Sequence, residues 1–131
     1  VVGFMNTLKL EAARYDIKIN ALAPLAATRI AEPSGIFDTY DAELVTPESV
    51  AAMVSYLVSE DCTDSGNVIA ATAGYYSKIQ VMESAGVRVD PRQTMTPEKI
   101  ADLWSQITSM DDPKGYYDAV ENLTAVMAKE D

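Results

Sequence analysis

Few side chains in this sequence could act as general bases, nucleophiles or metal ligands. The chain contains no histidine, so serine–histidine and cysteine–histidine hydrolysis within it is excluded and the commonest metal ligand is absent. The one cysteine, Cys62, lies in a polar turn with no neighbouring His or Lys to favour a reactive thiolate. Asp61 and Asp64 flank that turn, and Asp111-Asp112 precede a helix, so the acidic residues form no paired-carboxylate motif. They predict no metal site.

The residues best placed to contact a ligand lie in a long loop after a short apolar run. Residues 25–45 lack a clear period and contain Pro33, Ser34 and Gly35, which predicts a loop, with one short helix, of a length typical of a binding lid. Loops that follow strands are where open α/β sheets bind ligands. Thr28 fits either an ordinary loop position or such a contact. Arg29 fits either an attraction to a ligand phosphate or an ion pair with a carboxylate of the loop.

A helix and a strand must position this loop. Residues 1–15 carry apolar side chains at helical spacing, and further apolar residues widen the stripe, which predicts a helix buried on two sides, as between a sheet and a partner subunit. Residues 17–23 form a short apolar strand halted by Pro24. A helix that feeds a strand through one or two residues is the second half of a βαβ crossover.

Three further helices and one further strand follow. Thr46-Pro47-Glu48 and Thr96-Pro97-Glu98 each combine a Thr cap, a first-turn proline and an acid near the positive end of the helix dipole. Asp112-Pro113 is expected to open the last helix, and residues 67–72 form the second strand, ending near Gly74. Two strands this short cannot make a stable sheet alone, so neighbouring strands are expected from elsewhere.

Composition sets outer limits on function. The chain has 131 residues, 48% of them hydrophobic and 23% charged, as expected of one globular core. Its formal net charge of -10 repels phosphate backbones, so nucleic acid is not an expected partner. With no signal peptide, and no apolar run near the roughly 20 residues of a membrane span, we expect a soluble protein of the cytoplasm or another intracellular compartment.

The first residues predict a missing upstream segment. The chain opens on Val1-Val2-Gly3-Phe4-Met5, with the apolar face of the helix already in register and neither an initiator Met nor a helix cap before it. A processed or trimmed terminus is the alternative interpretation.

The order of these elements resembles the short-chain dehydrogenase/reductase family from Val1 to about Gly74. Residues 6–11 and 19–24 are similar to the helix and sixth strand that follow the family's active-site lysine, and residues 59–66 to the segment that enters the seventh strand. Leu25 stands where most members have Gly. The stretch from Pro24 to Ile30 is more similar to the Pro-x-Ala-x-Ser/Thr-Arg-hydrophobic loop of a subfamily that includes (3R)-hydroxyacyl-CoA dehydrogenases of β-oxidation. Its members carry a tail, which residues 75–110 resemble.

The family's own catalytic and cofactor motifs are not in this sequence. No glycines have the Gly-x-x-x-Gly-x-Gly spacing that cradles a pyrophosphate. None of the seven tyrosines has a Lys four positions later, where the family's base and its lysine stand, and Tyr15 and Lys18 are one residue too close. The resemblance places that lysine, and the carbonyl-binding serine, upstream of Val1. We therefore expect no catalytic residue in this chain and no cofactor binding by the isolated chain.

The resemblance implies a fold and a set of contacts. The fold class is α/β, the C-terminal portion of a Rossmann-like doubly wound parallel sheet over residues 1–74, with a helical C-terminal extension over residues 75–131. Tyr75, Tyr76 and Lys78 are expected on a helix packed against the last strand, and a nucleotide-binding cluster is the alternative. Trp104 is expected in the core. The parent enzyme would use NAD or NADP. Its contacts on the nicotinamide side would be Pro24, Ala26, Ala27 and Thr28. A substrate lid at about residues 25–45 would include Arg29, Ile30, Ile36 and Phe37.

The implied function belongs to a larger molecule. The parent would interconvert 3-hydroxyacyl and 3-oxoacyl groups, as CoA thioesters, and this portion would be inactive alone. Its expected partners are a missing N-terminal half and a second copy bound through the first helix. The alternative is a stand-alone, non-catalytic assembly module whose apolar first helix is its main contact surface.

Overall fold

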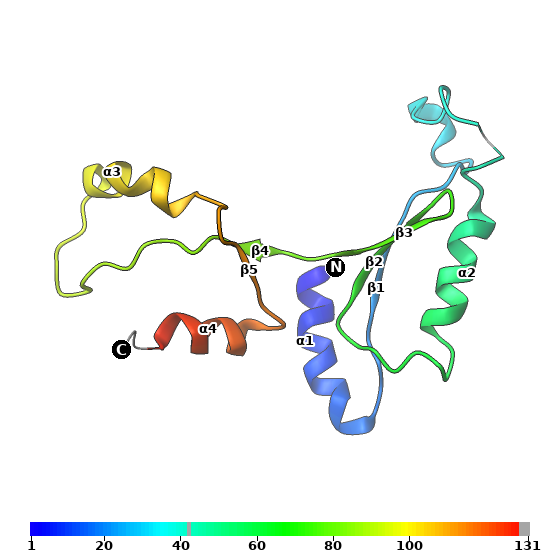
Figure 1. Ribbon diagram of the computed structural model, residues 1–131. Coiled ribbons are helices and arrows are strands. Elements are labelled where there is room, and N and C mark those ends of the chain that lie inside the picture. The colour runs from blue at the N-terminus through cyan, green and yellow to red at the C-terminus, as the bar shows by residue number, and fades with distance from the viewer. Residues whose placement is uncertain (42, 129–131) are drawn as a thin grey trace. The chain divides into compact units, whose positions relative to one another are not determined.

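The computed structural model describes residues 1–41 and 43–128. They fall into two compact units, Val1–Gln80 and a second unit that starts at Val81, and each is described by itself (Figure 1). The sequence predicts the boundary after Gly74. The structure places it later because the strand that follows Gly74 belongs to the sheet of the first unit.

The first unit is an α/β layer built around a parallel strand pair. Helix α1 (Val2–Ala12) continues into a short 3₁₀ helix, η1 (Ala13–Tyr15), and leads to strand β1 (Ala21–Pro24). Helix α2 (Pro47–Leu57) then connects β1 to the parallel strand β2 (Val68–Thr72), with Ala21 opposite Val68 and Pro24 opposite Ala71. Figure 1 shows the sheet between α1 and α2. The two strands that the sequence predicts are thus parallel neighbours in one sheet; strands from a partner segment stay a prediction.

A third strand closes the order β1-β2-β3. Strand β3 (Tyr75–Ile79) runs antiparallel to β2, and the turn between them is only Ala73-Gly74. The helix expected at Tyr75, Tyr76 and Lys78 is therefore wrong. Ala73 and Gly74 have φ of 45° and 75°, as a tight hairpin turn requires, and the aromatic residues that follow suit a strand. An alanine in this left-handed region costs about 1 kcal/mol.

The core of the first unit lies between the helices and the sheet. Helix α1 buries Met5, Lys9 and Ala12, which share one face. The other buried residues of the described chain are Ala21, Val45, Val50, Cys62 and Ala71. Phe4, on another face of α1, is 72% exposed, and its burial by a partner subunit stays a prediction.

The second unit has two helices and a small ribbon. Strand β4 (Met82–Glu83) pairs antiparallel with β5 (Lys114–Gly115). Helix α3 (Pro97–Ile107) lies between these strands in the sequence, and helix α4 (Ala119–Met127) follows β5 (Figure 1). The helices confirm the predicted helical tail, while the ribbon was not predicted. The last helix begins at Ala119 and not at Asp112-Pro113, because the carboxylate that accepts hydrogen bonds from the first-turn amides belongs to Asp118.

No described residue from Val81 onward is buried. Trp104, expected in the core, is 58% exposed on α3. Its apolar stripe has the predicted helical spacing, but within residues 81–128 no second layer covers it. In the part of the chain that the structure describes, no helix has the length and apolar character needed to cross a membrane.

Candidate functional site

The predicted contact loop lies at the carboxyl end of the parallel strand pair. Beyond Pro24, the Leu25 amide donates to the Ala71 carbonyl of β2 at 3.1 Å, so the ladder extends one residue past β1. The Ala27 amide then donates to the Val45 carbonyl at 2.7 Å. Val45 is buried just before α2, so the loop is fixed at both ends of its lid segment. The sequence predicts the loop, and the structure shows that the carbonyls of Ala71 and Val45 anchor it.

Two backbone amides next to these anchored ones make no hydrogen bond within the described chain. Neither the Ala26 nor the Thr28 N–H has a hydrogen-bond partner among residues 1–41 and 43–128, and the Thr28 hydroxyl has none there either. The Thr28 carbonyl accepts from the amides of Ala31 and Glu32 at 2.8 and 3.0 Å, which turns the chain away from the sheet. Ala26 is half-buried and Thr28 is exposed. Two backbone donors and one hydroxyl are thus held at the strand end, where they could bind a carbonyl or carboxamide oxygen.

The predicted lid residues extend from this loop without a polar contact back to it among the described residues. Arg29 and Ile30 lie in the turn after Thr28, and Ile30 is 93% exposed. Ile36 and Phe37 follow the short 3₁₀ helix η2 (Glu32–Ser34) and the turn at Gly35. Part of the predicted lid, residue 42, lies outside the described residues.

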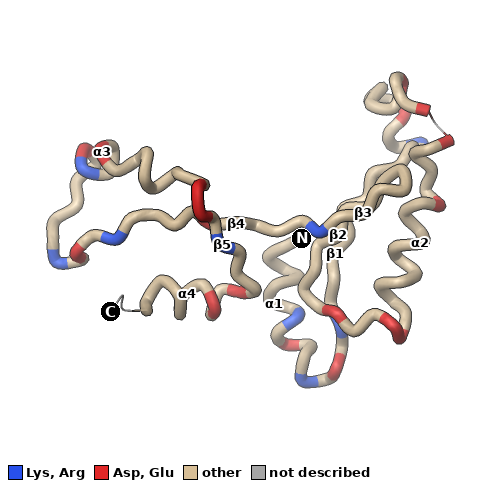
Figure 2. Tube along the Cα trace, viewed as in Figure 1, with Lys and Arg blue, Asp and Glu red and all other residues tan. Residues whose placement is uncertain are grey.

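The structure bears on the two roles predicted for Arg29, attraction to a ligand phosphate or an ion pair with a carboxylate of the loop. Arg29 forms no ion pair with any described residue. Because the guanidinium is permanently charged and exposed, it remains available to an anionic group of a ligand. Figure 2 shows acidic residues spread along the same loop and elsewhere, with the basic residues scattered between them.

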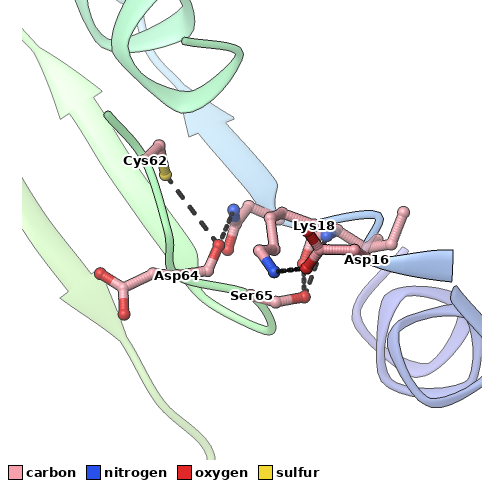
Figure 3. A network of polar contacts seen from close by, with 7 residues as sticks. Asp16, Lys18, Cys62, Asp64 and Ser65 are labelled. Carbon is pink, nitrogen blue, oxygen red and sulfur yellow. Dashed lines mark hydrogen bonds and ion pairs between the residues drawn. The ribbon is translucent and has the colours of Figure 1, made fainter. Parts of the chain in front are cut away.

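The amino ends of the strands are joined by a different kind of network. The Ser65 hydroxyl accepts from the Ile19 amide at 2.9 Å, and the Gly66 amide donates to the Ile19 carbonyl at 2.7 Å (Figure 3). Asn20 accepts from the Asn67 amide at 3.0 Å and donates to the Asp64 carbonyl at 2.9 Å. Asn20 therefore bonds to a turn that is distant in the sequence. This network supports the fold at the end of the sheet opposite the loop.

Two charged residues of that end form an exposed pair. Lys18 donates a hydrogen bond to Asp16, and this bond together with the lysine charge lowers the pKa of the Asp16 carboxyl (Figure 3). The Asp16 side chain is 91% exposed, so the pair contributes little to stability. Among the described residues, no cluster of His, Cys, Asp or Glu could hold a metal ion.

Comparison with known proteins points to a family. No protein-family model matches the chain. Peroxisomal multifunctional enzyme A from Dictyostelium discoideum is 36% identical over 128 residues, which cover 98% of this chain and 28% of that protein. A short-chain type dehydrogenase/reductase from Mycobacterium tuberculosis is 36% identical over 114 residues, 87% of this chain and 38% of the relative. The chain is thus similar, over most of its own length, to members of the short-chain dehydrogenase/reductase family.

A solved structure of a family member supports the fold. Full-length peroxisomal multifunctional enzyme type 2 from Drosophila melanogaster superposes with a TM-score of 0.74 and 27% identity, covering 95% of this chain and 22% of that one. The chain thus has the α/β fold of a portion of these Rossmann-like enzymes, as its sequence predicts. It spans well under half the length of the relatives that it matches.

The turn between β2 and β3, at the same end of the sheet as the contact loop, was not predicted from the sequence. The Ala73-Gly74 turn ends β2 next to the residue that accepts from Leu25. A strand followed by a Gly-containing pair and an aromatic run is a hairpin signal, and it could have been recognised. The usual Asn or Asp at the first turn position is absent, which is why the pattern is weak.

Proposed function

We propose that this chain is part of an NAD(P)-dependent oxidoreductase that interconverts 3-hydroxyacyl and 3-oxoacyl groups carried as CoA thioesters, and that it is inactive alone. The supporting observation is the loop after β1, with its Leu25 and Ala27 amides anchored and its Ala26 and Thr28 amides uncommitted among the described residues. Relatives named as peroxisomal hydratase-dehydrogenase-epimerase and multifunctional enzymes support the substrate class.

The residues of this loop fit the carboxamide side of a nicotinamide. The dinucleotide, when bound, supplies hydride transfer. The Thr28 hydroxyl and the amides of Ala26 and Thr28 would hold the carboxamide, and the anchors on Ala71 and Val45 would fix the position of the ring. Pro24 is the last residue of β1, just before the loop, and the backbone of Ala27 would shape that loop. The lid residues would exclude water when substrate is present.

The proton-transfer and cofactor-binding groups must come from a companion segment. Strand β1 pairs with β2 on one edge, and its other edge has no strand among the described residues. We propose that a segment carrying the glycine-rich turn and Tyr-x-x-x-Lys adds its strands there. We further propose that a second copy covers the exposed face of α1, and that the assembled enzyme works in a soluble intracellular compartment, which the peroxisomal names of relatives support.

A reconstituted enzyme tests this proposal. The chain is produced together with the N-terminal dehydrogenase segment of the M. tuberculosis relative, and oxidation of 3-hydroxyacyl-CoA is followed by the absorbance of reduced nicotinamide. We expect turnover from the assembly, and neither turnover nor NADH binding by calorimetry from the chain alone. Micromolar NADH binding to the isolated chain would contradict the expected division of labour. An assembly that forms but turns nothing over would favour the non-catalytic module.

A matched pair of variants locates the nicotinamide contact. Thr28→Val removes the hydroxyl with little change in shape and should raise KM for the dinucleotide about tenfold, the value of one lost hydrogen bond. Thr39→Val makes the same change at an exposed position of the same loop and should leave KM unchanged. Equal effects from both variants would refute the role of Thr28.

A further inference from the structure

Ala73, in the turn between β2 and β3, has a strained backbone conformation, and no packing contact within the described chain requires an alanine there. Ala73 has φ of 45°, a backbone conformation in which asparagine and glycine are far more favourable than alanine. A Cβ built on Gly74, the other turn residue, would meet nothing within 4 Å. Ala73 itself is exposed. No contact within the described chain therefore explains why the first turn position carries a methyl group.

The turn lies at the edge of the sheet that carries the contact loop. The Ala71 carbonyl accepts from the Leu25 amide at 3.1 Å, and Ala73 follows two residues later, so its Cα is within about 8 Å of that of Ala71. Leu25, whose amide makes that bond, is 46% exposed, and Tyr75, which starts β3 after the turn, is 63% exposed. Exposed apolar residues of three segments thus belong to the end of the sheet that carries the uncommitted donors.

We propose that Ala73 is a specificity-determining residue whose methyl group forms part of the wall against the acyl portion of the substrate. This inference rests on the function proposed above. Strained backbone persists where the surroundings or a ligand require it. At this position asparagine would relieve the strain but present a polar amide to the acyl chain, and glycine would relieve it but remove the apolar contact. Alanine is the small apolar residue that remains.

Two substitutions in the reconstituted enzyme test the proposal because they separate stability from binding. Ala73→Asn should raise the melting temperature by roughly 2–5 °C, since it removes strain, while it raises KM for a medium-chain 3-hydroxyacyl-CoA about tenfold and leaves KM for the dinucleotide unchanged. Ala73→Gly should raise KM for the same substrate about threefold, the weight of one buried methyl group. The dinucleotide KM serves as the internal control in both variants.

Asp16→Asn is the matched control at another position. Asp16 also has a positive φ, 56°, and lies at the opposite end of the sheet on an exposed turn. The Asp16→Asn substitution introduces an asparagine into the same left-handed backbone region, and KM for the acyl-CoA should not change.

The outcomes distinguish this inference from the proposed function. If the unsubstituted assembly fails to oxidise 3-hydroxyacyl-CoA, the proposed function and the inference both fall. If it is active and Ala73→Asn and Ala73→Gly leave KM for the acyl substrate unchanged, the inference alone is overturned, and the strain in the turn has no role in binding. Should Ala73→Asn prevent assembly, Ala73→Gly decides.

Discussion

Asn20 joins two turns that are far apart in the sequence, and removing its side chain should loosen the amino end of the sheet. Its carboxamide oxygen accepts from the Asn67 amide at 3.0 Å, and its nitrogen donates to the Asp64 carbonyl at 2.9 Å. Asn20→Ala deletes both bonds. The Asn67 carbonyl accepts from the Ala21 amide at 2.8 Å, so the start of the β1–β2 ladder should weaken with them.

The size of the effect follows from the burial of each bond. The bond to Asn67 is part-buried, and losing it leaves an amide without a partner, which costs about 1–2 kcal/mol; the exposed bond to Asp64 adds roughly 0.5 kcal/mol. A total of about 2 kcal/mol corresponds to a rise in local opening of roughly 30-fold.

Amide hydrogen exchange followed by NMR measures this opening directly. The amides of Asn67 and Ala21 should exchange roughly 30-fold faster in Asn20→Ala. Asn6→Ala is the matched control, because it deletes the same side chain from α1, where Asn6 makes no side-chain hydrogen bond to any described residue, and it should leave both rates unchanged. If the Asn67 amide exchanges less than about threefold faster in Asn20→Ala, or if the Asn6 variant has an equal effect, the reasoning is refuted.

Three smaller perturbations follow from other contacts. Tyr76→Phe removes the phenol that donates to the Ser49 carbonyl at 2.7 Å; since this bond is exposed, the free energy of unfolding measured with urea should fall by only about 0.5 kcal/mol. Asp118→Ala removes the α4 cap, which accepts from two first-turn amides, and should lower helicity by circular dichroism, with a cost of about 1 kcal/mol. The hydrogen bond and charge of Lys18 lower the folded pKa of Asp16, so the small stability that the pair adds is present above the unfolded pKa and is lost as pH falls through the folded value. Asp16→Asn should remove that acid-dependent component from titrations of stability, and high salt should mask it.

The sequence predicts the centre of the first unit well because several local signals agree there. The first apolar run reaches Pro24 and the run at residues 67–72 is followed closely by Gly74, both common strand-end signals, and Thr46-Pro47 begins the helix between them. Parallel pairing then follows because a long crossover that contains this helix connects the two strands. The location of the contact loop is predictable for the same reason.

Other features depend on contacts that no local pattern reports. The Ala27 amide is anchored by Val45, far along the chain, so the alternation of used and unused donors cannot be read from residues 24–28. At the start of α4, Asp112-Pro113 has the composition of a cap, but Asp118 makes the bonds. The stripe that contains Trp104 indicates an apolar face and not the partner that covers it.

The proline that ends β1 has an effect on the strand's unpaired side. The amides of Ala21 and Leu25 both bond toward β2, and because parallel ladders alternate, the even-numbered positions face outward. There Leu22 offers an N–H, whereas Pro24 offers none. A strand that pairs on this side would find no backbone donor at Pro24, whereas the hydrogen bonds to β2 continue to Leu25. A strand on that side would therefore separate from β1 earlier along the chain than β2 does.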